Sequence, residues 1–219
     1  MVTIYFDLDG TLIDPKIGIT RSIQYALRKL DLTVPHEDDL TWCIGPPALD
    51  SFKQLLGEDS LAHKALLLYR QRFSEIGIYE NTVYGGIVET LAALIDQGRR
   101  LFVATSKLQI FAERIIKNFN LTPYFEGVFG AQMDGARSDK TELLKHALDI
   151  GGVDPAQAVM VGDRSYDIIG ARNNGMLPIG VLYGYGSKKE LVLAGAHYLC
   201  ETPREVLGYT LVGNKIAPR

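Results

Sequence analysis

The stretch Ile4-Tyr5-Phe6-Asp7-Leu8-Asp9-Gly10-Thr11 decides the fold, because a short apolar run ends there in two acidic residues and a glycine. Short, uninterrupted apolar runs are typical of strands that are buried on both faces of a parallel sheet. Two-residue spacing on an extended strand points Asp7 and Asp9 the same way, and Gly10 allows a turn that exposes backbone N–H groups to an anion. The alternative is that Asp9-Gly10 is only a strand-ending turn.

Further apolar runs alternate with helical segments along the rest of the chain. The expected helices start and stop at readable caps, such as Asp139 with Glu142 in a capping box. The expected strands are Thr3–Leu8, Leu101–Thr105, Ala158–Gly162, Ile179–Tyr183 and a weaker Tyr198–Leu199, and the expected helices are Ile87–Gln97, Gln109–Phe119, Thr141–Leu148 and Tyr166–Asn174. This alternation predicts an α/β fold with a Rossmann-like, doubly wound parallel sheet.

A different pattern separates the first strand from Gly86. Apolar residues recur there at helical spacing and no convincing strand is present, so an all-helical segment interrupts the α/β unit. We expect residues 1–15 and 85–219 to form the core and residues 16–84 to form an inserted helical cap. The cap is expected over the carboxyl ends of the strands, because the chain leaves the first strand there and open α/β sheets bind ligands at that edge.

Composition excludes several classes of protein. With 219 residues, 47% of them hydrophobic and 22% charged, the chain is neither disordered nor fibrous. The net charge of −3 and the lack of long basic runs disfavour nucleic acid as a partner, and no apolar stretch is long enough to span a membrane. Cys43 and Cys200 are far apart and form no metal-binding spacing. We therefore expect a reduced, cytoplasmic protein. We also expect a monomer or homodimer that acts on a small molecule.

Polar side chains follow two further strands. Thr105-Ser106 ends one apolar run, and Gly162-Asp163 ends another, with Asp167 four residues later. Lys140 lies in the first turn of a helix, where the helix dipole opposes a cation, so its position favours a bound anion. The alternatives are ordinary ones: Thr105 and Asp167 could be helix caps, and Lys140 could be a solvated surface residue.

These motifs, in this order, resemble those of the haloacid dehalogenase-like (HAD) hydrolase superfamily, and the resemblance covers the whole chain. The helical insert after the first motif is similar to the subfamily that contains phosphoglycolate phosphatases, 5′-nucleotidase-like phosphatases and β-phosphoglucomutases. Ile44-Gly45-Pro46-Pro47, Ala104-Thr105-Ser106-Lys107 and the stretch 162–171 resemble the 5′-nucleotidase-like branch most. Ser106 stands where phosphoglycolate phosphatases usually have Asn, and Gly85-Gly86 replaces the usual Pro-Gly.

The resemblance implies a phosphatase that works through an aspartyl-phosphate. Asp7 would be the nucleophile, and Asp9 would protonate the leaving alkoxide and later activate water. Thr105 and Lys140 would bind phosphate oxygens, helped by backbone N–H groups near Gly10 and Ser106.

Magnesium is the cofactor that the resemblance implies. It would be held by an Asp7 carboxylate oxygen, the Asp9 backbone carbonyl and Asp163, with Asp167 as a supporting or direct ligand. Phosphoryl transfer needs this positive charge because the phosphate and the carboxylates crowd negative charge together.

The leaving group is expected to meet the cap. Trp42, Phe52 and Arg70 are the candidates for that contact, although aromatic residues at helical spacing are more often core. An aromatic lining favours a nucleoside 5′-monophosphate, so a 5′-nucleotidase is the leading hypothesis and a phosphoglycolate phosphatase is the alternative. From another class, a catalytically silent HAD-fold binding or regulatory protein remains open.

Overall fold

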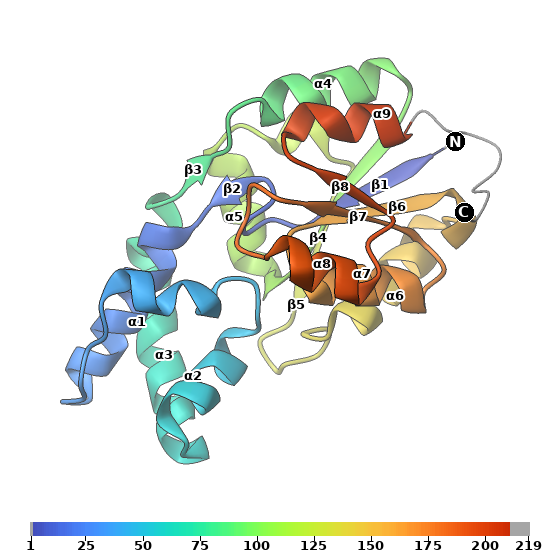
Figure 1. Ribbon diagram of the computed structural model, residues 1–219. Helices are drawn as coiled ribbons and strands as arrows, with labels where there is room; N and C mark the ends of the chain where they lie inside the picture. The colour runs from blue at the N-terminus through green and yellow to red at the C-terminus, as the bar shows by residue number, and fades with distance from the viewer. Residues whose placement is uncertain (1, 211–219) are drawn as a thin grey trace.

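The computed structural model describes residues 2–210, and its centre is a six-stranded parallel sheet with the strand order β5-β4-β1-β6-β7-β8 (Figure 1). The strands of this sheet are β1 (Thr3–Phe6), β4 (Arg100–Leu108), β5 (Gly127–Ala131), β6 (Ala158–Gly162), β7 (Leu177–Val181) and β8 (Tyr198–Cys200). The order places β1 between β4 and β6, so the first strand of the chain lies at the centre of the sheet. The expected doubly wound parallel sheet is confirmed.

Helices cover both faces of the sheet. Ile4 and Phe6 of β1 belong to a cluster that includes buried residues of the helices on one face, whereas Tyr5 packs with those on the other. This alternation explains why the strand reads as an unbroken apolar run. The helices of the first face are α4 (Ile87–Asp96), α5 (Gln109–Asn118) and α9 (Val206–Thr210), and those of the second are α6 (Lys140–Gly151), α7 (Ser165–Asn173) and α8 (Lys188–Ala194).

Residues 15–81 form a helical insert that projects to one side of the sheet in Figure 1. Its chain leaves and returns through a short antiparallel pair, β2 (Ile13–Asp14) and β3 (Thr82–Val83). Its helices are α1 (Lys16–Lys29), α2 (Ala48–Leu56), α3 (Asp59–Glu75) and the short 3₁₀ helices η1 (Glu37–Cys43) and η2 (Gly77–Tyr79). The insert is helical, as its periodicity indicates, apart from the two strands at its base.

The sequence interpretation missed several elements of the core. Strand β5 was not expected, because its apolar residues Val128 and Phe129 stand between two glycines that weaken the strand signal. Helix α8 and two short 3₁₀ helices, η3 (Thr122–Tyr124) and η4 (Pro155–Gln157), were also missed, and the core further contains η5 (Pro203–Glu205). These elements lie away from the centre of the sheet, so the prediction of the site did not depend on them.

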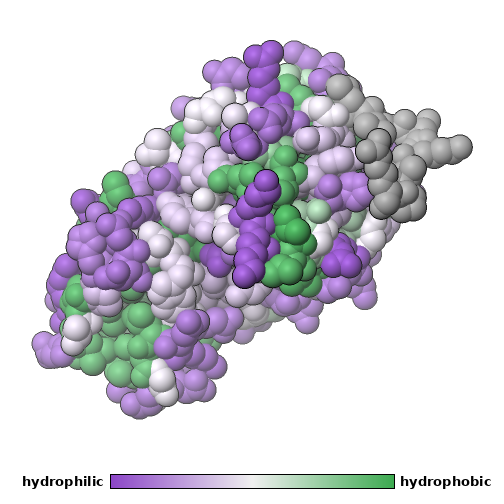
Figure 2. All heavy atoms as spheres, in the orientation of Figure 1, coloured by the Kyte–Doolittle hydropathy of each residue, from purple (hydrophilic) through white to green (hydrophobic). Residues whose placement is uncertain are grey.

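Figure 2 shows hydrophobic residues at the surface in two places, over the helical insert and over the C-terminal part of the core. Strongly exposed apolar residues of these regions include Leu67 of α3 and Leu193 of α8, at 66% and 75% exposure. Among the residues that the structure describes, no helix has the length and hydropathy that a membrane crossing requires.

Candidate active site

Three strands deliver the polar residues to one edge of the sheet. Asp7 follows β1, Thr105 lies near the end of β4, and Asp163 follows β6. Strands β4 and β6 are the parallel neighbours of β1, so their carboxyl ends meet at the same edge. The Asp7 N–H donates to the Val161 carbonyl at 2.9 Å, which holds Asp7 beside the carboxyl end of β6. The topology therefore brings together residues that are far apart in the sequence.

Lys140 links two of the buried carboxylates. Its Nζ lies 2.8 Å from Asp7 Oδ1 and 2.7 Å from Asp167 Oδ1, and it donates to the Ala104 carbonyl at 3.0 Å. Burial by itself lowers the pKa of Lys140, but the charges of Asp167 and Asp7 outweigh it, so that the pKa is raised. Lys140 is thus a buried cation beside Asp7, and it is not a solvated surface residue.

Asp163 is fully buried beside this trio. Its Oδ2 accepts a hydrogen bond from the Tyr185 N–H at 2.8 Å, and Thr11 donates weakly to Oδ1 at 3.4 Å. Burial, together with the charges of Asp167 and Asp7, raises the pKa of Asp163 well above its usual range. Burial likewise raises the pKa of Asp167 to about 6, even though Lys140 opposes the shift. The carboxylates of this edge are held close enough to repel one another.

This arrangement fits a divalent cation. Asp7, Asp163 and Asp167 each offer a carboxylate oxygen, and these oxygens lie within 4.8 Å of one another, all of them buried. Hard oxygen donors are the ligands that Mg²⁺ and Ca²⁺ select. A bound cation would also relieve the repulsion that raises the pKa of Asp163 and Asp167. The Asp9 carboxylate is not part of this cluster. A role for the Asp9 backbone carbonyl as a metal ligand stays a prediction.

Gly10 serves the acidic cluster in a way that the sequence analysis did not foresee. Its φ of +82° suits glycine, and a Cβ there would lie 2.2 Å from Asp163 Oδ2. Its own N–H already donates to the Ile13 carbonyl at 2.8 Å, so it is not free to bind phosphate. The glycine is needed because Asp163 occupies the space that a side chain would fill.

Asp9 forms an ion pair with Lys107, a residue that was not among the candidates from the sequence. Lys107 Nζ lies 2.7 Å from Asp9 Oδ2 and 2.8 Å from Oδ1, and both side chains are less than a tenth exposed. Burial raises the pKa of Asp9, and the charge and hydrogen bond of Lys107 oppose that shift. Lys107 belongs to the quoted stretch Ala104–Lys107, but only the fold shows that it reaches Asp9.

A strand irregularity explains how Ser106 and Lys107 reach the site. The pairing of β4 with β5 shifts register between Thr105 and Leu108, so the two intervening residues leave the regular ladder. Such bulges re-aim side chains, and here Ser106 and Lys107 line a cavity. The Thr105 hydroxyl accepts a hydrogen bond from the Lys107 N–H at 3.3 Å. Thr105 is therefore a buried residue at the edge of the site and not the cap of helix α5.

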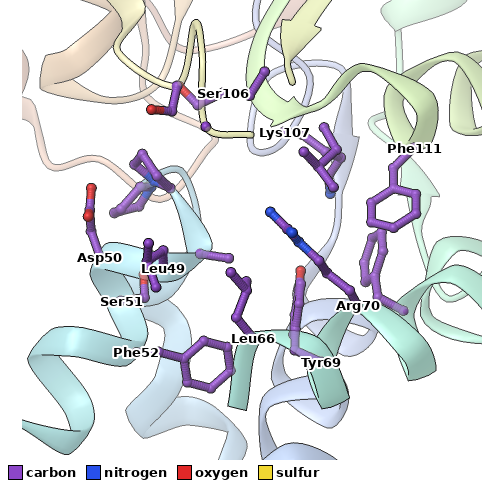
Figure 3. A pocket seen from close by; sticks show the side chains of 18 of the residues that line it. Leu49, Asp50, Ser51, Phe52, Leu66, Tyr69, Arg70, Ser106, Lys107 and Phe111 are labelled. Carbon is purple, nitrogen blue, oxygen red and sulfur yellow. The ribbon is translucent and has the colours of Figure 1, made fainter. Parts of the chain in front are cut away.

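A cavity of about 360 Å³ lies between the strand ends and the helical insert. Asp7, Asp9 and Thr105 are part of its lining on the core side, and apolar residues of the insert form much of the opposite wall. Figure 3 shows Leu49, Leu66 and Tyr69 of that wall on the side nearer the end of β4, with Phe52 lying deeper in the insert. The insert therefore stands over the carboxyl ends of the strands, where the sequence placed it.

Two of the three candidates from the insert line this cavity. Phe52 contributes to its wall, and Arg70 extends from α3 toward the end of β4 (Figure 3). Trp42 is not part of the lining, because it lies in η1 and packs, partly buried, against the hydrophobic core. Among the described residues, Arg70 forms no ion pair and donates no hydrogen bond, so its guanidinium is available to a ligand in the cavity.

Comparisons with known proteins show which family the chain resembles. The family described as haloacid dehalogenase-like hydrolase matches residues 4–181. A 5′-nucleotidase of Pseudomonas aeruginosa is 46% identical over 189 residues, which cover 86% of each chain. The tyrosine-protein kinase PtkA of Mycobacterium tuberculosis is 41% identical over 184 residues, which cover 84% of this chain but only 62% of that protein.

A solved structure shows the same fold. The crystal structure of a predicted phosphatase from Clostridium acetobutylicum superposes with a TM-score of 0.93 at 39% identity and covers 96% of this chain and 99% of that one. The acidic cluster and the buried Lys140 lie within the stretch that the family matches. This chain belongs to the haloacid dehalogenase-like hydrolase family.

Proposed function

We propose that the protein is a magnesium-dependent phosphomonoesterase that acts through an aspartyl-phosphate, with nucleoside 5′-monophosphates as its preferred substrates. The observation that carries the proposal is the position of Asp7, which faces the cavity on one side and contacts Lys140 on the other. The 5′-nucleotidase and phosphatase among its relatives support the same activity.

The first half of the reaction uses Asp7 and Asp9. An Asp7 carboxylate oxygen attacks phosphorus, a new P–O bond forms, and the bond to the leaving oxygen breaks. Asp9 gives its proton to that oxygen, so the leaving group departs as a neutral alcohol. Lys107 holds the Asp9 carboxyl at the edge of the cavity during this step. Burial, which raises the pKa of Asp9, favours the protonated form that this role requires.

The second half reverses the role of Asp9. Its carboxylate takes a proton from water, and the water oxygen attacks the phosphorus of the aspartyl-phosphate. The Asp7–phosphate bond breaks, and inorganic phosphate and free Asp7 are restored. The Thr105 hydroxyl, which lines the cavity, binds a phosphate oxygen. Lys140, whose ammonium donates to Asp7, Asp167 and the Ala104 carbonyl, offsets the negative charge beside the phosphate. Magnesium, which Asp7, Asp163 and Asp167 would hold, would supply positive charge that offsets the charge of the transferred group.

The wall of the cavity supports a nucleoside as the leaving group. Phe52, Leu66 and Tyr69 offer an apolar surface against which a flat base can pack. Phosphoglycolate, the alternative substrate, needs a group that binds its carboxylate, and Arg70 is the cation of the insert that lines the cavity. We propose that the insert acts as the cap that closes over the leaving group, and that the protein works in the cytoplasm as a monomer or homodimer.

The test is a panel of phosphate esters with free phosphate as the readout. We expect at least one nucleoside 5′-monophosphate to show a kcat/KM about tenfold or more above that of 2-phosphoglycolate. A higher value for phosphoglycolate contradicts the nucleotidase and leaves the phosphatase intact. If no ester in the panel is hydrolysed with magnesium present, the catalytically silent binding protein is the correct alternative.

A further inference from the structure

Two stretches that the catalytic chemistry leaves unexplained meet in the structure. Ile44-Gly45-Pro46-Pro47 belongs to the helical insert, and Arg164 follows Asp163 in the core. The Arg164 side chain crosses from core to insert, and its Nη1 donates a hydrogen bond to the Ile44 carbonyl. The contact joins residues 120 positions apart. The Arg164–Ile44 hydrogen bond therefore connects the insert to the core and is not part of a local turn.

The guanidinium of Arg164 is held in place from the core side. Its Nε donates to Glu190 Oε1 at 3.0 Å, and the same carboxylate oxygen accepts the Ser165 N–H at 2.8 Å. The side chain of Arg164 is 15% exposed and that of Glu190 is 25% exposed, so water competes only in part for this pair. The Arg164 N–H donates to Asp167 Oδ2 at 3.1 Å, which ties its backbone to the acidic cluster.

Gly45 leaves the space that the Arg164 side chain occupies. It has a φ of +103°, and a Cβ at this position would lie 2.7 Å from Arg164 Cγ. Any side chain at position 45 would therefore be strained and would collide with the arginine. The glycine and the arginine are complementary across the boundary between insert and core, which gives a reason for both residues in the two stretches.

The segment that Arg164 holds is part of the cavity wall. Gly45, Pro46 and Pro47 line the cavity together with the first residues of α2, and α2 supplies Phe52. Proline restricts the backbone of this segment, so fixing the Ile44 carbonyl also limits where the following residues can lie. A single contact at one end of the loop can thus set the position of the wall that faces the leaving group.

We propose that Arg164 is a positioning residue that latches the 44–47 loop onto the core and thereby sets the affinity for the leaving group. It does not touch the reacting atoms. The choice of a nucleotide to measure this affinity rests on the proposed function, whereas the attachment of the loop itself can be measured without any substrate.

Trp42 offers the direct readout, because it is the only tryptophan of the chain and lies two residues before Ile44. Arg164→Met keeps the aliphatic stem and removes the guanidinium. We expect the acrylamide quenching constant of Trp42 to rise by about half or more, since release of the loop opens the segment locally to solvent. Gly45→Ala, which disturbs the same contact from the insert, is expected to raise quenching in the same direction.

Arg172→Met is the matched control. Arg172 lies on α7, the helix that begins directly after Arg164. It too donates through Nη1 to a carbonyl, that of Ala194 at 2.9 Å, but its partner lies in α8 of the core. We expect this variant to leave Trp42 quenching within about a tenth of the wild-type value, since core openings do not reach the insert. Equal changes in the two arginine variants, or no change in Arg164→Met, overturn the latch.

The kinetic readout separates the latch from a general loss of structure. In Arg164→Met we expect KM for the best nucleotide of the panel to rise about tenfold while kcat falls less than about threefold, the size of effect expected from one charge-assisted hydrogen bond. For acetyl phosphate, whose leaving group is too small to reach the wall, KM should rise less than about threefold.

The outcomes distinguish the two proposals. Equal KM increases for both substrates contradict a latch that acts on the leaving group. If the wild-type protein hydrolyses acetyl phosphate but no nucleotide, the proposed substrate is wrong, and the Trp42 measurement still decides the latch. A rise in the magnesium requirement of Arg164→Met without a change in Trp42 quenching shows that Arg164 serves Asp163 or Asp167 instead.

Discussion

The core side and the insert side of the cavity are lined by different types of residue. On the core side, buried charges hold one another: Lys140 contacts Asp7 and Asp167, and Lys107 contacts Asp9. On the insert side, apolar and aromatic residues predominate, and Arg70 has no ionic partner among the described residues. The core side is already organised for one reaction, because its charges fix each other's positions. The insert side, in contrast, can change with the leaving group, since apolar contacts discriminate only modestly.

The largest effect is expected from a change at the core side. Asp7→Asn keeps the shape of the side chain and removes the nucleophile, so kcat should fall about a thousandfold or more for every substrate. Phosphate release measured beside Asp96→Asn, an exposed position on α4, checks this expectation. Turnover by a folded Asp7→Asn protein above background would falsify the assigned nucleophile.

The acidic cluster is expected to give the next largest effect. Chelation should reduce activity to near zero, and Asp163→Asn should raise the magnesium concentration for half-maximal activity about tenfold or more, because a neutral amide is a weaker ligand. A magnesium titration of this variant beside Asp149→Asn, on the surface of α6, makes the measurement. Full activity after thorough removal of metal contradicts the role of the cluster.

A smaller and selective effect is expected at the wall. Phe52→Leu removes a ring that lines the cavity, so the kcat/KM ratio of nucleotide to phosphoglycolate should fall about three- to tenfold. Trp42→Leu, which changes an aromatic residue outside the lining, should alter that ratio less than about twofold. If Trp42→Leu has the larger effect, the wall is not where the leaving group binds, and the comparison between the two sides fails.

The smallest effect concerns the base of the insert, where Glu80 accepts from Arg72 at 2.9 Å and from Arg21 at 3.2 Å. Burial raises the pKa of Glu80, but these arginines outweigh it and lower the pKa below its ordinary value of 4.5. A lowered pKa means that the pair stabilises the fold above that ordinary value and that its contribution is lost as pH falls through the folded-state pKa.

Glu80→Gln should therefore lower the free energy of unfolding by about 1 kcal/mol at neutral pH, a value that allows for solvent screening of the pair. The difference from the wild type should disappear in acid below the lowered pKa. Denaturant unfolding at several pH values measures this, with the exposed Glu75→Gln as the control. A difference that persists unchanged in acid shows that the charge of Glu80 is not the cause.

Sequence alone predicted the fold class and the residues of the acidic cluster. Asp7, Asp163 and Lys140 could be identified because each stands at the end of a readable strand or at the start of a readable helix. The alternation of strands and helices predicted a doubly wound sheet, but the strand order came from the structure. The position of the insert over the strand ends followed from the point where the chain leaves β1. These inferences depend on local patterns, which can be recognised within short stretches of the sequence.

Only the tertiary structure decided which side chains meet across the chain. Lys107 reaches Asp9 because a bulge in β4 re-aims it, and the sequence has no periodic signal for a single register shift. Trp42 and Phe52 are both aromatic residues of the insert, yet only Phe52 lines the cavity. Arg164 donates a hydrogen bond to the carbonyl of Ile44, which lies 120 residues away in the sequence. Such contacts are set by packing between elements, and packing depends on how all the surfaces fit together and not on the local preferences of any one segment.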